Sequence, residues 1–139
     1  MPCTPLYLKA LLLPCACLLL LGCASPPTAV KVEQLLKTGQ SWIGTPYTWP
    51  DGKPEFTVVK ITLPASTALK WHTHPMPNIA YVVAGELMVE TEDGLHKTTL
   101  GPGQALPEMV NTSHRGTSGK APVELIVFYA GTPGMPLSH

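Results

Sequence analysis

The sequence contains few charged residues, and the two signs balance. Lys and Arg together number nine, Asp and Glu also number nine, and the formal net charge of the 139 residues is zero. Proteins that bind nucleic acid carry a surplus of positive charge, and disordered chains combine high net charge with few apolar residues. With 45% hydrophobic residues and no surplus of either sign, the chain is predicted to fold and to bind no nucleic acid.

Cysteine is absent from residues 24–139, since all four cysteines lie at or before position 23. This part of the chain can therefore form no internal disulfide, even in an oxidising compartment. It also has no thiolate with which to bind a metal. Imidazole and carboxylate groups remain as its strong metal ligands.

Long stretches that favour a helix are also missing. The chain has 16 prolines and 12 glycines; proline removes a helical hydrogen bond, and glycine loses more backbone entropy than other residues. The length corresponds to one domain. We therefore expect a single all-β domain with many turns.

The longest apolar run lies at the N-terminus, where residues 6–23 carry a single charge, on Lys9. A basic residue beside such a run is typical of an export signal. The run ends at Leu20-Leu21-Gly22-Cys23, which resembles the bacterial lipobox, in which the cysteine is acylated and becomes the first residue. We therefore predict a lipoprotein signal peptide at 1–22, lipidation of Cys23 and a proline-containing tether at 23–29. The Ala24 that follows favours an outer-membrane lipoprotein facing the periplasm.

Two other interpretations of this run remain open. It could be an uncleaved membrane anchor, or ordinary signal peptidase could cleave it near Ala24. The run is short for a membrane span, and Pro14 interrupts it. Both observations count against the membrane anchor.

Residues 30–139 are predicted to form the single domain. Residues 30–37 (VKVEQLLK) have apolar residues at helical spacing and are predicted to form a short helix that ends before Gly39. Short β-branched and apolar runs separated by Gly, Pro and Asp-Gly predict strands in the remainder. These runs are 56–63, 68–74, 79–84, 86–91, 95–100, 105–110 and 123–130. Strands spaced so closely are typical of a sandwich or a small barrel.

The pair His72-Thr73-His74 is the sharpest chemical feature. Alternate residues of a strand point to the same face, so both imidazoles would project together. Two neutral imidazoles side by side can bind a divalent transition metal. Alone, the H-x-H pattern is weak evidence for a metal site, since it also fits two exposed or hydrogen-bonded histidines.

The spacing of Ser66, His72, His74, Asn78 and Gly85 resembles the first motif of the cupin superfamily. In that motif a Gly precedes H-x-H, and a Glu and a second Gly follow it. Both histidines and Gly85 match the motif. Ser66 stands at the first Gly, and Asn78 stands where the motif has its Glu.

A second group of residues resembles the second cupin motif, in which Gly is followed by Pro, Gly, His and Asn. Gly103 and His114 match at the full spacing, whereas Met109, Asn111 and Ser118 replace the Pro, the second Gly and the Asn. Asn tolerates the left-handed backbone conformation that Gly usually supplies, so Asn111 is a reasonable substitute.

The resemblance implies a small antiparallel β-barrel, the double-stranded β-helix or jelly roll, with the short helix at its N-terminus. It also implies one divalent transition metal (Fe, Mn, Zn, Ni or Cu) bound by His72, His74 and His114. Asn78 in place of Glu removes a negative charge; its amide oxygen could ligate weakly or bond to a neighbour. The implied function is a non-haem oxygenase or isomerase that acts on a small chelating molecule. The alternative is a non-catalytic module that binds a metal or a small ligand.

Glu108 lies in an apolar stretch six positions before His114. If it points inward, it could be an extra metal ligand, a partner that orients an imidazole, or a general base. If it points outward, it is a solvated surface residue. Arg115 could pair with Glu108, meet an anionic substrate or remain in solvent.

The other candidates have simpler interpretations. Trp71 and Tyr81 are expected to pack in the barrel wall. His96 is expected to be exposed, and His139 to be disordered. Cupin barrels often form dimers, and residues 42–49 could serve a homodimer or cover their own barrel.

Overall fold

The computed structural model describes residues 29–139. The predicted signal peptide, Cys23 and all but the last residue of the predicted tether lie outside the described residues. One compact unit runs from Glu33 to His139. In this described part of the chain, every regular element is a strand. None of its residues belongs to a helix with the length and hydrophobicity needed to cross a membrane.

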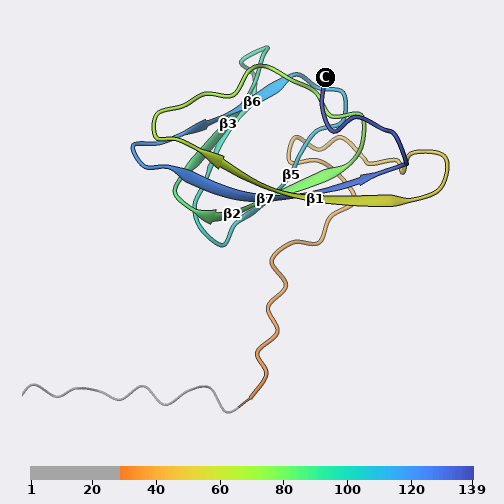
Figure 1. Ribbon diagram of the computed structural model, residues 1–139, viewed down its shortest axis with the longest axis horizontal. Helices are drawn as coiled ribbons and strands as arrows, with labels where there is room; N and C mark the ends of the chain where they lie inside the picture. The colour runs from red at the N-terminus through yellow and green to blue at the C-terminus, as the bar shows by residue number, and fades with distance from the viewer. Residues whose placement is uncertain (1–28) are drawn as a thin grey trace, which may run out of the picture. The chain divides into compact units, whose positions relative to one another are not determined.

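Seven strands make up the domain, and each pairs with its neighbours in antiparallel fashion (Figure 1). They are β1 (Glu55–Leu63), β2 (Asn78–Ala84), β3 (Leu87–Thr91), β4 (Lys97–Leu100), β5 (Ala105–Pro107), β6 (His114–Ser118) and β7 (Val123–Gly131).

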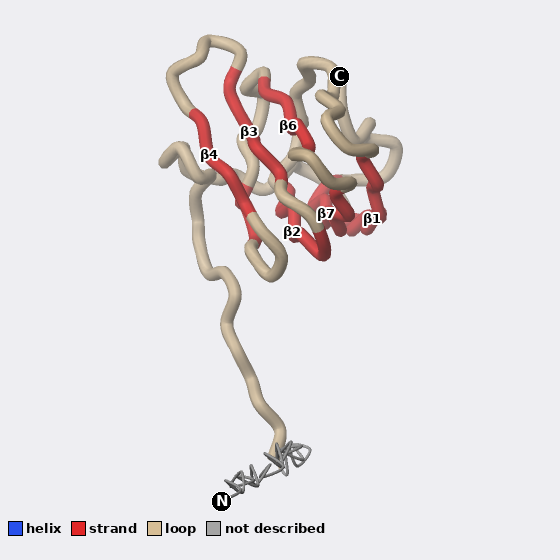
Figure 2. The backbone as a smooth tube through the Cα atoms, turned by 90° about the vertical axis from the view of Figure 1, so that its left-hand side faces the viewer, coloured by secondary structure: helices blue, strands red, loops and turns tan. Residues whose placement is uncertain are grey.

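The strands form two sheets, which Figure 2 shows side by side. One sheet has the order β1-β7-β2-β5 and the other has the order β4-β3-β6. Apart from Met109, the buried apolar side chains belong to one cluster that both sheets contribute to: Leu63, Met76, Ala80, Val82, Leu87, Val89, Leu100, Leu106, Val123, Leu125, Val127 and Tyr129. The all-β jelly roll expected from the sequence is thereby confirmed.

The alternation of side chains along the strands explains this arrangement. In β1 the residues facing the core, such as Ile61 and Leu63, alternate with more exposed ones such as Val58 and Lys60. In β7 the burial pattern also has a period of two. This period is that of a pleated strand with one face on the core and one towards solvent.

The hairpin turn between β3 and β4 lies where Asp-Gly predicted it. Gly94 has a φ of +72°, and its amide donates to the carbonyl of Thr91 at 3.0 Å. The Asp93 carboxylate accepts bonds from the Thr91 hydroxyl and from the amide of Leu95. These two hydrogen bonds to the Asp93 side chain stabilise the turn.

The predicted helix at 30–37 is wrong, because these residues are irregular in the structure. Val30 and Val32 are 93% and 88% exposed, and Leu35 is 54% exposed. A helix of two turns is marginal in water unless its apolar side chains are buried. The spacing was suitable, but the burial that would stabilise the helix is missing.

The strand predictions were wrong in two places. Residues 68–74 are not a regular strand and make only isolated bridges at Ala68, His72 and His74. The strand predicted at 105–110 ends at Pro107, after three residues. Conversely, β6 was not among the predicted runs, because its sequence HRGTS is mostly polar. Its buried positions hold His114, Gly116 and Ser118 instead of aliphatic side chains.

Candidate metal centre

His72 and His114 come from segments far apart in the sequence and pair directly. The amide of each donates to the carbonyl of the other at 3.0 Å. His74 lies two residues further on and forms a parallel bridge with Val110. The segment around 72–74 therefore lies beside β6 although it is not a regular strand.

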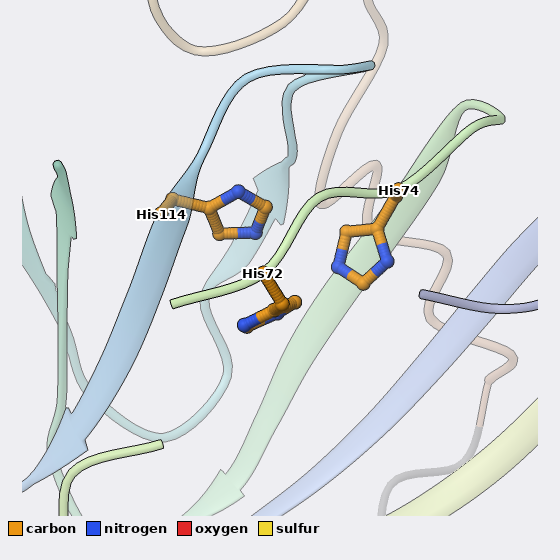
Figure 3. A group of neighbouring side chains, drawn as sticks. All are labelled: His72, His74 and His114. Atoms are coloured by element: carbon orange, nitrogen blue, oxygen red, sulfur yellow. The ribbon is translucent and has the colours of Figure 1, made fainter. Parts of the chain in front are cut away.

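The three imidazoles converge, as Figure 3 shows. Their ring centroids are 4.6 to 5.1 Å apart, and their nearest ligand atoms all lie within 4.8 Å of one another. His74 and His114 are buried, at 3% and 1% exposure, and His72 is half-buried. The sequence predicted this group of three, and the structure brings it together.

Each imidazole is held by a backbone carbonyl at Nδ1. His72 Nδ1 bonds to the carbonyl of Lys70 at 2.8 Å, and His114 Nδ1 to that of Thr112 at 2.8 Å. His74 Nδ1 bonds to the carbonyl of Leu137 at 2.6 Å. A carbonyl can only accept, so in each ring Nδ1 carries a proton. In the neutral rings the lone pair is then on Nε2, as a metal ligand requires.

Glu108 points inward, so the structure chooses between its two predicted orientations. It is 8% exposed, and its Oε2 lies 3.2 Å from His74 Nε2 and 3.9 Å from His114 Nε2. Its backbone carbonyl accepts a 2.5 Å bond from the hydroxyl of Tyr47. The carboxylate thus lies beside the Nε2 atoms that could bind a metal.

The charges of this group depend on one another. Burial alone would raise the pKa of the Glu108 carboxyl, but the imidazoles of His114 and His74 beside it outweigh this effect and lower that pKa to about 2. Burial opposes protonation of His114, yet the Glu108 carboxylate raises the pKa of His114 above its usual value. Burial lowers the pKa of His72. The site therefore holds a carboxylate that stays ionised among imidazoles.

This donor set fits a cation. His114 Nε2 is buried and has no hydrogen-bond partner among the described residues. With protons on Nδ1, the three Nε2 lone pairs and one carboxylate oxygen would all be electron donors at one cavity. Such an arrangement needs positive charge between the donors, from protons or from a metal ion. Imidazole nitrogen with one carboxylate suits a divalent transition metal.

Asn78, which stands where the resemblance places a Glu, begins β2 and is 2% exposed. Among the described residues neither atom of its amide group has a hydrogen-bond partner. The amide of Glu108 donates to the Asn78 carbonyl at 3.1 Å. Asn78 is therefore the backbone partner of Glu108.

The histidines line a cavity of about 40 Å³. Its wall contains His72, His74, Glu108 and His114 together with Ile61, Leu69, Ala80, Leu87, Val89, Gly116, Leu125, Val127 and Tyr129. About 10–15 Å³ suffices for one water, so the space suits an ion with one or two small ligands. A second cavity of about 300 Å³ is mainly aromatic and apolar; it is lined by Thr38, Gly39, Tyr47, Trp49, Phe56, Pro77, Asn78, Ile79, Phe128, Tyr129 and Ala130.

Arg115 does not pair with Glu108. Its guanidinium bonds to the Glu90 carboxylate at 2.8 and 2.9 Å and lies 4.2 Å above the ring of Trp71. Trp71 therefore packs under a cation, and Tyr81 is half-buried on β2. Arg115 follows His114 on β6, so the alternation of the strand directs it to the opposite face.

The predictions for the two remaining histidines have different outcomes. His96 is exposed as predicted, with its ring edge-to-face against Trp42 at 5.9 Å. The prediction that His139 is disordered is wrong, since its amide and carbonyl both bond to Thr73, at 3.1 and 3.2 Å. Trp42 covers its own core, whereas Trp49 is 69% exposed.

Sequence reasoning missed three contributors to the site. Leu137 acts through its carbonyl, which no side-chain motif can reveal. Tyr47 lies 61 positions from Glu108, the residue that it contacts. Tyr129 lines the same cavity as the histidines, and its ring lies 5.4 Å from that of His74. The alternation of β7 would have placed Tyr129 inward beside Val127.

Comparison with known proteins agrees with this geometry. A family model described as a cupin domain matches residues 59–129. A search of curated proteins gave no match.

Three solved structures illustrate the structural similarity. DMSP lyase DddQ from Ruegeria pomeroyi DSS-3 has a TM-score of 0.53 at 23% identity, covering 58% of this chain and 41% of that one. KdgF from Halomonas sp. has a TM-score of 0.51 at 24% identity, covering 59% of this chain and 74% of that one. The polyketide cyclase RemF from Streptomyces resistomycificus has a TM-score of 0.53 at 18% identity, covering 68% of this chain and 67% of that one. This chain thus spans less than half of the DMSP lyase, and these identities show a shared fold alone.

Proposed function

This chain belongs to the cupin domain family, and from that premise we propose that it binds one divalent transition metal. His72, His74 and His114 would supply three nitrogen ligands through Nε2. Glu108 would supply a carboxylate oxygen. We propose further that the metal centre acts on a small molecule that chelates the metal, as an oxygenase or an isomerase.

One observation carries this proposal. All three Nδ1 atoms are bonded to backbone carbonyls, and the ligand atoms of the three rings lie within 4.8 Å of one another. Histidines that merely filled a core would have no need of three fixed tautomers with unprotonated nitrogens facing a common point.

Glu108 is better suited to be a ligand than a general base. A general base works best with a pKa near the working pH, whereas the pKa of Glu108 is about 2. The group therefore remains an anion throughout the pH range in which the imidazoles are neutral. A permanent negative charge offsets part of the charge of a divalent ion.

The residues that line the cavity would then surround the substrate at the metal. When bound, a transition metal supplies Lewis acidity, or redox chemistry with dioxygen, at positions that the protein leaves open. The apolar wall of the cavity, including Val89 and Leu125, limits water around these positions and strengthens electrostatic contacts there. The volume of about 40 Å³ restricts the bound part of the substrate to a few atoms.

Metal content tests the first part of the proposal. We expect about one metal per wild-type chain by inductively coupled plasma mass spectrometry, and loss of that metal in a His72→Ala/His114→Ala variant. His96→Ala is the matched control, because His96 is exposed and lies outside the cavity. Equal metal content in all three proteins would contradict the proposed metal site.

Turnover tests the second part. The iron-loaded protein would be incubated with diketones, catechols and thiols while oxygen consumption and loss of each compound are recorded. Loss with oxygen consumption supports an oxygenase, and conversion without it supports an isomerase. The small cavity favours a second candidate, a non-catalytic module. That candidate predicts no conversion but a higher melting temperature when a compound binds.

We also propose that the chain is a lipoprotein of the cell envelope, anchored through Cys23 and facing the periplasm. The support is the apolar run that ends at Leu20-Leu21-Gly22-Cys23. Mass spectrometry of the purified protein should find an acylated Cys23 at the N-terminus. A protein that begins at Met1 would contradict this proposal.

A further inference from the structure

The three imidazoles are not held in the same way. His72 and His114 bond to carbonyls two residues before them, those of Lys70 and Thr112. These bonds form wherever the local backbone forms. His74 bonds instead to the carbonyl of Leu137, 63 positions away. The orientation of this one ring depends on a distant part of the chain.

A turn brings the distant segment to His74. The amide of Met135 donates to the carbonyl of Thr132 at 3.1 Å, and Gly134, between them, has a φ of +80°. Pro133 and Gly134 occupy the positions that a type II turn prefers for these residues. The sequence Thr132-Pro133-Gly134 thus directs the end of β7 back towards the site.

The residues after the turn, 135–139, are called the C-terminal segment below. The side chains of Met135 and Leu137 pack against the hydrophobic core. His139 and Thr73 exchange two backbone hydrogen bonds, of 3.1 and 3.2 Å. In Figure 1 the end of the chain, marked C, lies beside the segment that precedes β2. The carbonyl of Leu137 is therefore fixed by contacts on both sides of it.

This carbonyl decides which nitrogen of His74 carries the proton. The two neutral tautomers of imidazole are close in energy, and the hydrogen bond at one nitrogen selects between them. At the other nitrogen, Glu108 Oε2 lies 3.2 Å from Nε2. Without the Leu137 carbonyl, a neutral His74 would be favoured to place its proton on Nε2, towards Glu108. The lone pair facing the metal position would then be lost.

We infer that the C-terminal segment is a positioning element of the metal centre, which keeps Nε2 of His74 unprotonated through the carbonyl of Leu137. The inference rests on the metal centre proposed above. Its own consequence, the tautomer of His74, can be measured without any metal. The segment acts through His74 and touches no substrate.

Two truncated chains and one double glycine variant test this inference. A chain that ends at Met135 lacks the carbonyl of Leu137. A chain that ends at Leu137 is the control: it loses the bonds of His139 to Thr73, but it keeps the packing of Leu137 on the core and an acceptor oxygen in its terminal carboxylate. Pro136→Gly/Leu137→Gly keeps the full length but removes the packing and the stiffness that fix the carbonyl.

The first readout is the set of ¹⁵N chemical shifts of the imidazoles in the metal-free proteins, which report the protonation of Nδ1 and Nε2 of each ring separately. In the full chain and in the control, His74 should carry its proton on Nδ1. In the chain that ends at Met135 and in the glycine variant, the proton should move to Nε2. His72 and His114 should remain unchanged and serve as internal references.

The second readout is the affinity for Zn²⁺, measured by calorimetry. Loss of a partner that orients a metal ligand typically costs about 10–100-fold in affinity, and we expect a loss of that size in the two test variants. The control should bind like the full chain. Unchanged tautomers of His74 in the test variants would overturn the inference.

The remaining outcomes also decide. If the chain that ends at Met135 does not fold, the glycine variant and the full chain still report the tautomer of His74. A full chain with its proton on Nε2 of His74 overturns the inference directly. If the tautomers change as expected but the full chain binds no metal, the proposed metal centre fails while the positioning of His74 stands.

Discussion

Glu108, the residue directly after β5, lies opposite Asn78, the first residue of β2. The register pairs Ile79 with Pro107, and the amide of Glu108 donates to the carbonyl of Asn78 at 3.1 Å. Opposite residues of an antiparallel pair direct their side chains to the same face. The cupin motif places a carboxylate at the position of Asn78, and in this chain the carboxylate near the histidines comes from Glu108, directly after the neighbouring strand β5.

This relationship predicts that a carboxylate at position 78 can replace the carboxylate of Glu108. Glu108→Gln should lower Zn²⁺ affinity by about 10–100-fold, because an ionised oxygen beside the imidazoles is lost. Adding Asn78→Glu should restore most of the affinity, since Cβ atoms of opposite residues are about 4.5–5.5 Å apart and a carboxylate from either strand can reach the same region. Calorimetric titration of metal-free protein with Zn²⁺ measures both effects.

The matched control for that exchange is Asn78→Gln in the Glu108→Gln background. It lengthens the side chain at position 78 without adding charge. No recovery is expected there. Equal affinity of the Asn78→Gln and Asn78→Glu double variants would show that the carboxylate is not interchangeable between the strands.

Gly85, the last residue of the first motif, should tolerate no side chain. Its φ is +81°, and an added Cβ would overlap with the carbonyl oxygen of Pro122 and lie 2.9 Å from Val123 Cγ2. We expect Gly85→Ala to cost at least about 2 kcal/mol of unfolding free energy, since backbone strain and a backbone clash add. Gly94→Ala is the control, because Gly94 has φ +72° but nothing within 4 Å; only the strain of about 1–2 kcal/mol applies. Urea unfolding of both variants measures the difference.

Tyr47 and Tyr129 should ionise late. Burial, aided by the Glu108 carboxylate, raises the pKa of Tyr47 well above its usual value of 10 and that of Tyr129 to about 12. An unfolded chain releases these protons near pH 10, so stability is retained below pH 10 and lost as the pH rises towards 12. Tyr129→Phe should make this alkaline loss smaller in thermal unfolding. A folded protein whose tyrosines have all ionised by about pH 11, seen in ultraviolet absorbance, would contradict the expectation.

Several features of the site follow from spacing alone. Ser66 and Asn111 stand where the cupin motifs have glycine, and they are the non-glycine residues with positive φ in the described chain, at 52° and 54°. The motif specifies a backbone conformation, and these residues adopt it. His72, His74 and His114 could be predicted because each motif also fixes the distance from such a turn to its histidine.

Other features could not be predicted, for physical reasons. A strand presents two faces, so the sequence around Glu108 allowed either orientation; the hydrogen bond from the Glu108 amide to the carbonyl of Asn78 in β2 decides it. The bond from His74 to Leu137 involves a backbone carbonyl, a group that every residue possesses. The helix expected at 30–37 was judged from periodicity, whereas its absence reflects missing burial of Val30 and Val32.

The last prediction concerns pH and follows from the pair Glu108 and His114. The pKa of Glu108 is lowered from its ordinary 4.5 to about 2. The pair's contribution to stability through Glu108 is therefore present above pH 4.5 and lost as the pH falls towards 2. The pKa of His114 is raised above its ordinary 6.5. The contribution through His114 is present below pH 6.5 and lost as the pH rises through that raised pKa.

The metal-free protein should accordingly gain most from this pair between about pH 4.5 and 6.5, and its melting temperature should fall as the pH rises from 6.5 to 8. Zn²⁺ replaces the proton on His114, so its binding strengthens over the same range. Zn²⁺ at 100 times its dissociation constant adds about 2.7 kcal/mol, and the difference in melting temperature between metal-loaded and metal-free protein should widen from pH 5.5 to 8. Glu108→Gln should flatten the metal-free profile, because His114 then loses the anion that raises its pKa. A difference that is the same at both pH values in the wild-type protein would mean that metal and proton do not compete for His114.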